Sequence, residues 1–447
     1  MNTLKFLSDE IGLSTLARAG SDVYIIIIIR MVRLVGFGAT SLILALYLKE
    51  IGFNEDVIGL FMTITFVGDL IGSFLLSILS NKFGRKNSLI FSFAMTALTG
   101  LAFALLDNHY VLTAIAFFGI LTPSGGEVGP FRSIEQAGIA SLMVANDRSD
   151  IYAWYTFLGM FCGAIGSFLC GHIIDYTTDV LGFNLVESYK SIFLLYSILS
   201  FFSTLLCFGF SSNIEIKPLE RPAPQADESS ETEPLLNPES AATAKSRWQS
   251  MVPELHSSVL GIVIKMSLLF ALDSFASSLV PLSWQSFYIK RKFDVPASYL
   301  GSVFFITGIV SGFTSLLSTT FTKRLGAVVT MVVTHLPASI LLGCVPIPQS
   351  FKATLAILVF RASTQSMDVA PKHVFLATLI PDSERTIVFG WVNVVKTLAQ
   401  VLGPIFTGAF TKHGAQWITF VIASVLKSLY DLGMLGTFLS YNRHSEH

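Results

Sequence analysis

Charged residues are scarce in this sequence. Asp, Glu, Lys and Arg make up 13% of its 447 residues, against about 25% in an ordinary soluble domain. Hydrophobic residues make up 52%, and the mean hydropathy is +0.65. This balance favours a multi-pass membrane protein. A net charge of -1 and the lack of a long basic stripe give no sign of nucleic-acid binding.

Several other signals are also missing. The four cysteines, Cys162, Cys170, Cys207 and Cys344, lie singly in apolar stretches, which predicts small packing residues and neither a disulfide nor a zinc site. Residues 1–22 lack the pattern of a cleaved signal peptide. The sequence has no phosphate-binding loop, no His-x-x-x-His metal set and no GxSxG turn. We therefore expect no ATP-driven pump, no enzyme and no cofactor.

Long apolar stretches are abundant. A membrane-spanning helix needs about 20 mostly apolar residues, and twelve such stretches can be placed along the chain. They lie near residues 24–48, 56–80, 87–107, 110–134, 150–173, 188–211, 258–288, 297–322, 325–347, 352–378, 384–411 and 415–440. The predicted fold is an all-α membrane protein with twelve transmembrane helices in two pseudo-symmetric six-helix halves.

A polar segment separates the two sets of six. It is rich in Pro, Glu, Ser and Ala, which predicts a disordered linker. Lys and Arg in "NKFGRKN", "TKRLG" and other short loops place both termini and this linker in the cytoplasm, although "IKRKF" lies on the opposite side. The expected parts are an N-terminal segment 1–23, a first half 24–211, the linker 212–250, a second half 251–440 and a tail 441–447.

The two halves share a repeated pattern. "GEVGPF" aligns with "MDVAPK" at an offset of 241 residues, which matches Glu127 with Asp368. Downstream, Arg148 matches Arg385 at an offset of 237 residues. Offsets this constant over several spans indicate a duplication in which both halves keep the same topology.

The duplicated pattern resembles the major facilitator superfamily over about residues 24–440, and "EVGPF" paired with "MDVAP" is similar to a little-characterised microbial subgroup. In "SILSNKFGRKNSL", Gly84, Arg85 and Lys86 match the family's gating loop, whereas Asn81 replaces its aspartate. "PDSER" matches the loop pattern before the eleventh span. The resemblance gives Arg148 and Arg385 equivalent gating-loop positions. It also implies that spans one, four, seven and ten line a central cavity.

Seven of the charged residues inside the expected spans are candidates for a functional role. A charge at mid-bilayer costs at least ~2.5–3.5 kcal/mol, so such a residue usually faces a cavity or a partner. We predict that these seven serve substrate binding or proton coupling. They are Arg30, Arg33, Asp69, Glu127, Asp273, Arg361 and Asp368. The alternatives are structural ion pairs for the acids, charge neutralisation for the arginines and helix packing for Asp69.

The stretch around Glu127 is broken by glycines and prolines. Broken backbone at membrane depth is tolerated where protein or water satisfies it, which favours the wall of a wet cavity.

Depth along each span predicts which charges pair. At 1.5 Å per residue, Arg33 and Glu127 lie about 14 Å and about 12 Å from the cytoplasmic ends of their spans. Asp273 and Arg361 lie at about 22 Å and about 25 Å. We therefore expect the pairs Arg33–Glu127 and Asp273–Arg361. Asp368 is expected to reach Lys372 one turn away, or to stay unpaired and titrate.

The predicted function is secondary active transport of a small organic solute, driven by the proton gradient. Charges of both signs favour a zwitterion or an organic anion over a neutral sugar. The alternative is a membrane sensor or a lipid scramblase on the same fold, although a sensor would more typically have a long cytoplasmic tail. The expected partners are the solute, protons and the lipid bilayer, with the protein itself a monomer.

The linker contains "ETEPLL", in which Glu231 precedes Leu235 and Leu236. It resembles the acidic dileucine signal that sorting adaptors bind, which favours a vacuolar or lysosomal membrane over the plasma membrane or endoplasmic reticulum. A chance match in a polar linker is the alternative.

We predict that replacing Leu235 and Leu236 with Ala moves a tagged protein from an internal membrane to the cell surface, because an adaptor pocket loses both apolar side chains. Fluorescence imaging measures the shift, and Leu219→Ala, a linker leucine outside the motif, is the control. An unchanged distribution of the double variant would remove the vacuolar assignment.

Overall fold

The computed structural model describes residues 12–123, 131–144, 147–215, 257–369, 371–372, 375, 379 and 382–439. All regular secondary structure in these ranges is helical, as the sequence predicts. The helices of the first half are α2 (Leu13–Ala17), α3 (Ser21–Glu50), α4 (Glu55–Phe83), α5 (Arg85–Leu105), α6 (His109–Phe118), α7 (Phe131–Leu142), α8 (Arg148–Asp179), α9 (Leu185–Cys207) and the short η2 (Ser212–Ile214). Those of the second half are α10 (Ser257–Leu279), α11 (Leu282–Phe293), α12 (Ala297–Leu325), α13 (Ala327–Cys344), α14 (Phe351–Gln365), α16 (Asp382–Lys412) and α17 (Trp417–Phe438).

Among the described helices, ten segments are long and apolar enough to cross a membrane. The expected fourth and tenth spans are the two that are not among these ten segments. The fourth is divided into α6 and α7, and α6 ends directly before Gly119. The tenth begins as α14, which ends at Gln365. Both α6 and α14 end shortly before the stretches that the repeat aligns.

The seventh span is also divided, between α10 and α11, where the sequence predicted one helix. Pro281 stands at the division, and proline has no N–H for the helical hydrogen-bond ladder. The carbonyl oxygens left free accept other donors. The Thr407 hydroxyl donates to Leu279 at 2.5 Å, and the Gln285 amide donates to Val280 at 2.6 Å. Side chains thus satisfy the broken backbone inside the membrane.

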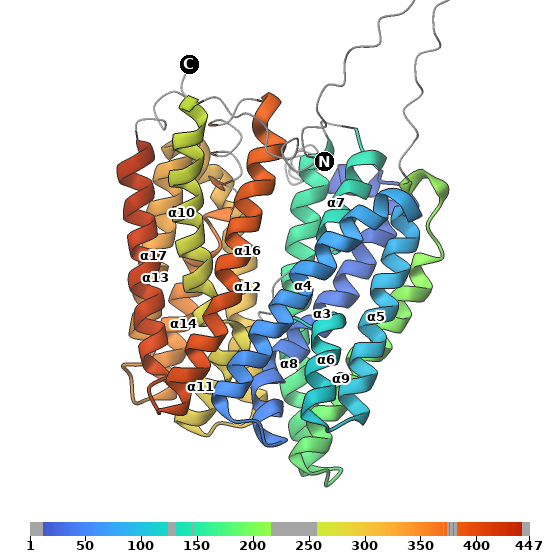
Figure 1. Cartoon of the computed structure of the whole chain (residues 1–447), viewed down its shortest axis with the longest axis vertical. Helices are drawn as coiled ribbons and strands as arrows, with labels where there is room; N and C mark the ends of the chain where they lie inside the picture. The colour runs from blue at the N-terminus through green and yellow to red at the C-terminus, as the bar shows by residue number, and fades with distance from the viewer. Residues whose placement is uncertain are drawn as a thin grey trace, which may run out of the picture.

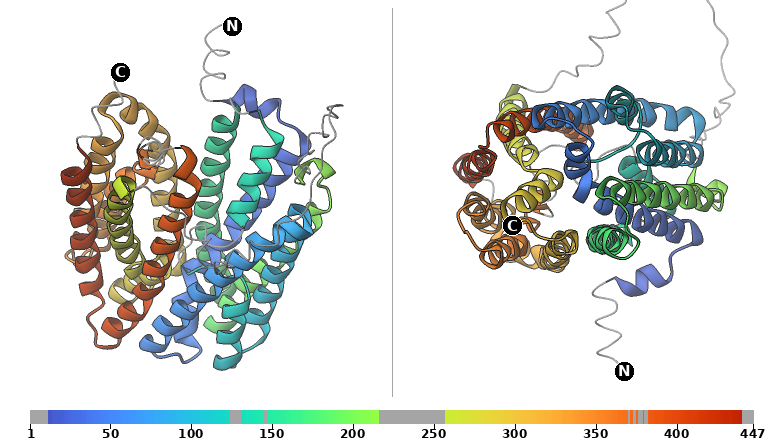
Figure 2. Two further views of the ribbon diagram at one scale, coloured as in Figure 1. Left: turned by 45° about the horizontal axis from the view of Figure 1, so that its top comes forward. Right: turned by 90° about the horizontal axis from the view of Figure 1, so that it is seen from below.

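The two halves form separate bundles that meet along two helix pairs, α8 with α12 and α4 with α16. Figures 1 and 2 show the bundles converging at one end and diverging toward the end where α2 begins and α17 finishes, which we call the terminal face. Asp175 fixes the convergent end, because its carboxylate accepts the N–H groups of Ala297 and Ser298 at 3.0 and 2.9 Å and so caps α12.

Small residues let the halves approach closely at this convergent end. A Cβ on Gly408 would lie 2.5 Å from the Glu55 carbonyl oxygen, and one on Gly301 would lie 2.5 Å from that of Ser167. Lys412 adds an ion pair to Asp56 at 2.8 Å. The structure is therefore closed at the convergent end.

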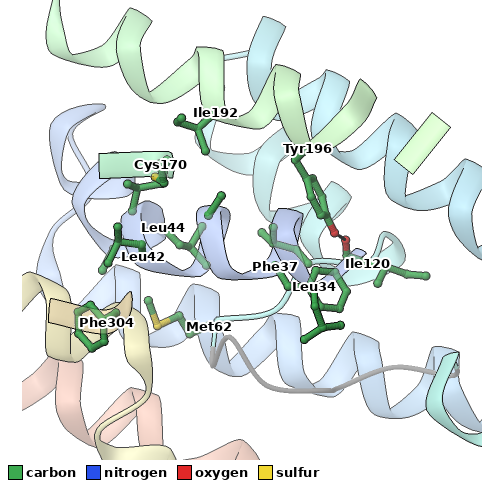
Figure 3. Packing of buried hydrophobic residues seen from close by; sticks show 14 of the residues in the cluster. Leu34, Phe37, Leu42, Leu44, Met62, Ile120, Cys170, Ile192, Tyr196 and Phe304 are labelled. Carbon is green, nitrogen blue, oxygen red and sulfur yellow. Dashed lines mark hydrogen bonds between the residues drawn. The ribbon is translucent and has the colours of Figure 1, made fainter. Parts of the chain in front are cut away.

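Helix α3 is the centre of the first bundle. It packs against α8 and α9, and its buried side chains join the main hydrophobic cluster. Figure 3 shows Leu34 and Phe37 of α3 beside Tyr196 of α9, whose hydroxyl donates to the Ile120 carbonyl at 2.9 Å. That bond holds the chain just after α6 against the bundle.

We predict that Gly38→Ala destabilises the protein by about 1–3 kcal/mol, because α3 and α8 must separate to admit the methyl group. A Cβ at Gly38 would lie 2.0 Å from the Gly163 carbonyl oxygen. Gly72→Ala in α4 is the matched control, since a Cβ there meets no atom within 4 Å. Thermal unfolding in detergent should show a lower melting temperature for Gly38→Ala alone, and equal values for both variants would contradict the packing described here.

Candidate functional site

A buried ion pair joins α3 to α7 in the first half. The Arg33 guanidinium donates to both oxygens of Glu135, with N–O distances of 2.8 and 2.9 Å. Arg33 is 3% exposed and Glu135 is fully buried. The Tyr155 hydroxyl of α8 donates to the same carboxylate at 2.6 Å. Two-point geometry with a further donor is what a buried ion pair needs to offset the cost of leaving water.

Arg30 lies one turn before Arg33 and binds α8. Its Nε donates to the Tyr155 carbonyl at 2.7 Å, and its guanidinium stacks 3.6 Å from the centre of the Tyr155 ring. Gly159 makes room for it, because a Cβ there would lie 2.5 Å from the Arg30 Nε. Tyr155 therefore contacts Arg30 through its ring and backbone and Glu135 through its hydroxyl.

Sequence reasoning missed Glu135. It lies one residue beyond the expected limit of the fourth span, so it was not counted among the membrane charges. Glu127 lies outside the described residues, and the predicted pairing of Arg33 with Glu127 stays a prediction. A search that extended each span by one turn would have found Glu135.

A second charge cluster lies in the other half. Asp273 of α10 binds Lys427 of α17 at 2.7 Å and Lys372 at 3.1 Å. Lys372 also binds Asp368 at 2.6 Å, and the Lys427 ammonium donates to the Ser277 hydroxyl at 2.7 Å. The cluster is thus a chain of two carboxylates and two ammonium groups.

The cluster confirms one predicted contact and overturns another. Asp368 does bind Lys372 one turn away, as expected. The predicted pair Asp273–Arg361 is wrong, because the partners of Asp273 are Lys372 and Lys427. Within the described ranges, Arg361 makes no hydrogen bond or ion pair. Equal depth along two helices does not show whether their side chains point toward each other.

The two clusters occupy equivalent places in the repeat with opposite charges. Arg33 and Asp273 are 240 residues apart, and Glu135 and Lys372 are 237 apart, close to the offsets of the alignment. In the first half the cation, Arg33, is on the first span of the half. In the second half the equivalent cation, Lys372, is on the fourth span.

A third polar group joins α13 to α17. His335 Nδ1 lies 2.8 and 3.0 Å from the two Asp431 oxygens, and the Ser339 hydroxyl donates to Asp431 at 3.0 Å. Both His335 and Asp431 are buried. This contact was not predicted from the sequence.

Asp69 on α4 differs from the other acids. It is 6% exposed, and in the part of the chain that the structure describes it makes no ion pair while its Oδ2 makes no hydrogen bond. A role of Asp69 in helix packing, the alternative considered from the sequence, stays a prediction. A buried carboxylate without a counter-ion is costly, which distinguishes Asp69 from the paired acids of the two clusters.

The gating-loop residues fasten α5 to the end of the first half. Gly84 has a φ of 87°, which favours glycine, and the loop turns there. The backbone N–H groups of Arg85 and Lys86 donate to the Glu215 carboxylate at 2.7 and 3.2 Å. The Lys86 ammonium donates to the carbonyls of Phe208 and Phe210 at 2.9 and 2.7 Å.

The gating roles of Arg148 and Arg385 and the sorting signal of the linker stay predictions. Arg148 donates to the Met143 carbonyl at 3.0 Å, which fixes its own loop. The Arg385 side chain lies outside the described residues, as do Glu231, Leu235 and Leu236. No group of three or more His, Cys, Asp or Glu residues suited to a metal ion occurs in the ranges described.

Comparison with known proteins settles the family. The profile of the Major Facilitator Superfamily matches residues 26–272 and again residues 266–441. The chain belongs to the major facilitator superfamily. The facilitator is 31% identical over 416 residues to the "Uncharacterized membrane protein YJR124C" of Saccharomyces cerevisiae, covering 91% of this chain and 92% of that protein. Family membership indicates a transporter rather than an enzyme.

Solved structures share the fold of this facilitator. A D-xylose–proton symporter superposes with a TM-score of 0.68 at 15% identity, covering 93% of this chain and 97% of the symporter. The nucleoside transporter NupG superposes with a TM-score of 0.64 at 14% identity, covering 94% and 99%. Identities this low show a common architecture of two six-helix halves.

We predict that Glu135→Leu destabilises the facilitator by about 3–5 kcal/mol, because it leaves the Arg33 charge buried without its partner. Arg33→Met combined with Glu135→Leu should recover most of the loss, since two apolar side chains need no counter-ion. Melting temperatures of the single and double variants in detergent form the test. Additive losses in the double variant would show that the two residues do not act as a pair.

Proposed function

We propose that this facilitator is a proton-coupled secondary active transporter of a small organic solute, working by alternating access between its two halves. The observation that supports this best is the pair of charge clusters on equivalent spans of the two halves. Charges buried at this cost are usually kept in membranes for function. The clusters involve helices that family members use to line the transport path.

The proton is expected to use carboxyl groups. Asp69 is buried without a counter-ion, and Asp368 shares Lys372 with Asp273. Binding of the solute, or a movement of one half against the other, could alter these contacts. Such a change would alter the free energy of protonating the Asp69 and Asp368 carboxyl groups. Glu127, which the repeat aligns with Asp368, completes the proposed set. In this scheme Arg30, Arg33, Asp273 and Arg361 bind the solute or hold the acids in place.

Alternating access fits the arrangement of the bundles. Their contacts concentrate at the convergent end, where Asp175 caps α12 and Lys412 binds Asp56. If both termini face the cytoplasm, as the loop charges predict, the structure is closed toward the opposite side. Opening that side requires both contacts to break, while Gly84, Arg85 and Lys86 keep α5 attached to its own bundle.

The address and assembly of the transporter are also proposed. We expect a monomer in the vacuolar or lysosomal membrane, delivered through an adaptor that recognises Glu231, Leu235 and Leu236. A sensor or scramblase on the same fold would bind a ligand or move lipid, but it would not accumulate a solute against its gradient.

We predict that Glu127→Gln and Asp368→Asn each reduce solute accumulation to the level seen without a pH gradient, because neither replacement can carry a proton at that position. Purified protein in liposomes is given a metabolite mixture with and without an inward proton gradient, and mass spectrometry of the contents measures uptake. Asp294→Asn is the control, since the Asp294 side chain is 93% exposed.

Two results would contradict this proposal. Gradient-driven accumulation at the wild-type level in both variants would remove the coupling role of Glu127 and Asp368. A wild-type protein that accumulates none of the mixture under either condition would favour the sensor or scramblase alternative, which a labelled-lipid exchange assay would then distinguish.

A further inference from the structure

Helix α16 has a polar stripe on the side opposite its exposed apolar surface. The stripe consists of Asn393, Lys396, Thr397 and Gln400, whose spacing of three, four and seven residues places them on one helical face. The exposed apolar side chains of α16, which include Trp391, Leu398 and Leu402, project from the other side. A spanning helix at the outside of a bundle places its apolar side toward lipid, so the stripe faces the interior of the protein.

The contacts of α16 show where the stripe points. Val401 accepts a hydrogen bond from Thr63 of α4 at 3.0 Å, and Gly408 touches the same helix. Gly403 and Thr407 touch α10. Projected around the helix at 100° per residue, Asn393 and Gln400 lie between these two directions. The stripe therefore faces the space between α4 and α10, at the level where the bundles diverge toward the terminal face (Figure 1).

Lys396 is a cation without a counter-ion. Its ammonium lies 5.9 Å from the centre of the Phe270 ring, and in the described part of the chain it makes no hydrogen bond or ion pair. The carboxylates of Asp273 and Asp368 already form ion pairs with Lys372 and Lys427.

Charges of both signs surround Lys396. The cations Arg132 of α7 and Lys372 and the carboxylates Asp273 and Asp368 all act electrostatically on its ammonium, and both carboxylates are already paired with Lys372 or Lys427. The side-chain amides of Asn393 and Gln400 make no hydrogen bond to a described residue. A positive group between unused amide donors is the arrangement that an anion needs.

We propose that this stripe binds the negatively charged group of the transported solute, so that the substrate is a small organic anion. The inference rests on the transporter function proposed above and narrows its substrate class. Lys396 supplies the charge, and Asn393 and Gln400 supply N–H donors to a carboxylate or a phosphate ester. Arg361, a second cation without a described partner, lies on α14 of the same half.

The test measures binding separately from transport. Full-length protein in detergent is titrated with succinate, glucose 6-phosphate, D-xylose and uridine, and the melting temperature is followed. We expect succinate or glucose 6-phosphate to raise it, with the response showing whether a carboxylate or a phosphate is preferred. Lys396→Gln should lower the affinity for that anion by about tenfold or more, whereas Lys396→Arg should retain most of the affinity.

Two further variants keep the result interpretable. Lys352→Gln removes an exposed lysine of the same half and should bind the anion as the wild type does. Gln400→Glu adds a negative charge to the stripe and should also lower the affinity for the anion. It tests the site independently if Lys396→Gln lowers the melting temperature of the unliganded protein.

The outcomes separate this inference from the transporter proposal. No response to either anion, or an unchanged anion affinity in both Lys396→Gln and Gln400→Glu, overturns the anion site. Uptake of D-xylose or uridine into liposomes without uptake of an anion overturns it while leaving a transporter. Lys396-dependent anion binding without movement into liposomes supports the anion site and contradicts the transporter.

Discussion

The cost of placing a charge inside a membrane is the constraint on which this structure depends. Arg33 meets it with two bonds to Glu135 and a third group, Tyr155, on the carboxylate. Asp273 meets it with two ammonium groups from different helices. Each solution ties together helices that are distant in sequence, so the pairs also specify how the bundles pack. Breaking one pair leaves a buried charge, which costs far more than losing an apolar contact.

The backbone obeys the same rule. Between α10 and α11, the Thr407 hydroxyl and the Gln285 side-chain amide donate hydrogen bonds to the carbonyl groups that have lost their helical donors. Beside this break, the Ser283 hydroxyl of α11 donates to the Pro123 carbonyl, which belongs to the interrupted fourth span of the other half. The divided spans of the two halves therefore touch each other. A movement of one half against the other acts directly on these broken segments, where backbone groups exchange partners most readily.

The sequence was sufficient to predict the spans, the repeat and the contact of Asp368 with Lys372, because each depends on periodicity along one chain segment. It was insufficient for contacts across the bundle. The estimate that paired Asp273 with Arg361 used depth, which gives the height of a side chain in the membrane but not its direction around the helix. Lys427 was overlooked because the resemblance pointed to spans one, four, seven and ten, and α17 is the twelfth. Glu135 was overlooked because the fourth span was ended one residue early. Side-chain direction and helix adjacency come only from tertiary packing.

The exchange of charge between the halves has a consequence for any solute that lies between them. Arg33 and Asp273 are equivalent in the repeat, so a symmetric ancestor cannot have had both of these charges at one position. The Arg33–Glu135 pair and the second cluster each hold as many positive as negative charges. Two cations of the second half, Lys396 and Arg361, have no counter-ion among the described residues. On the proposed function, the balanced clusters hold the helices in register, while the second half supplies the attraction that orients an anionic solute.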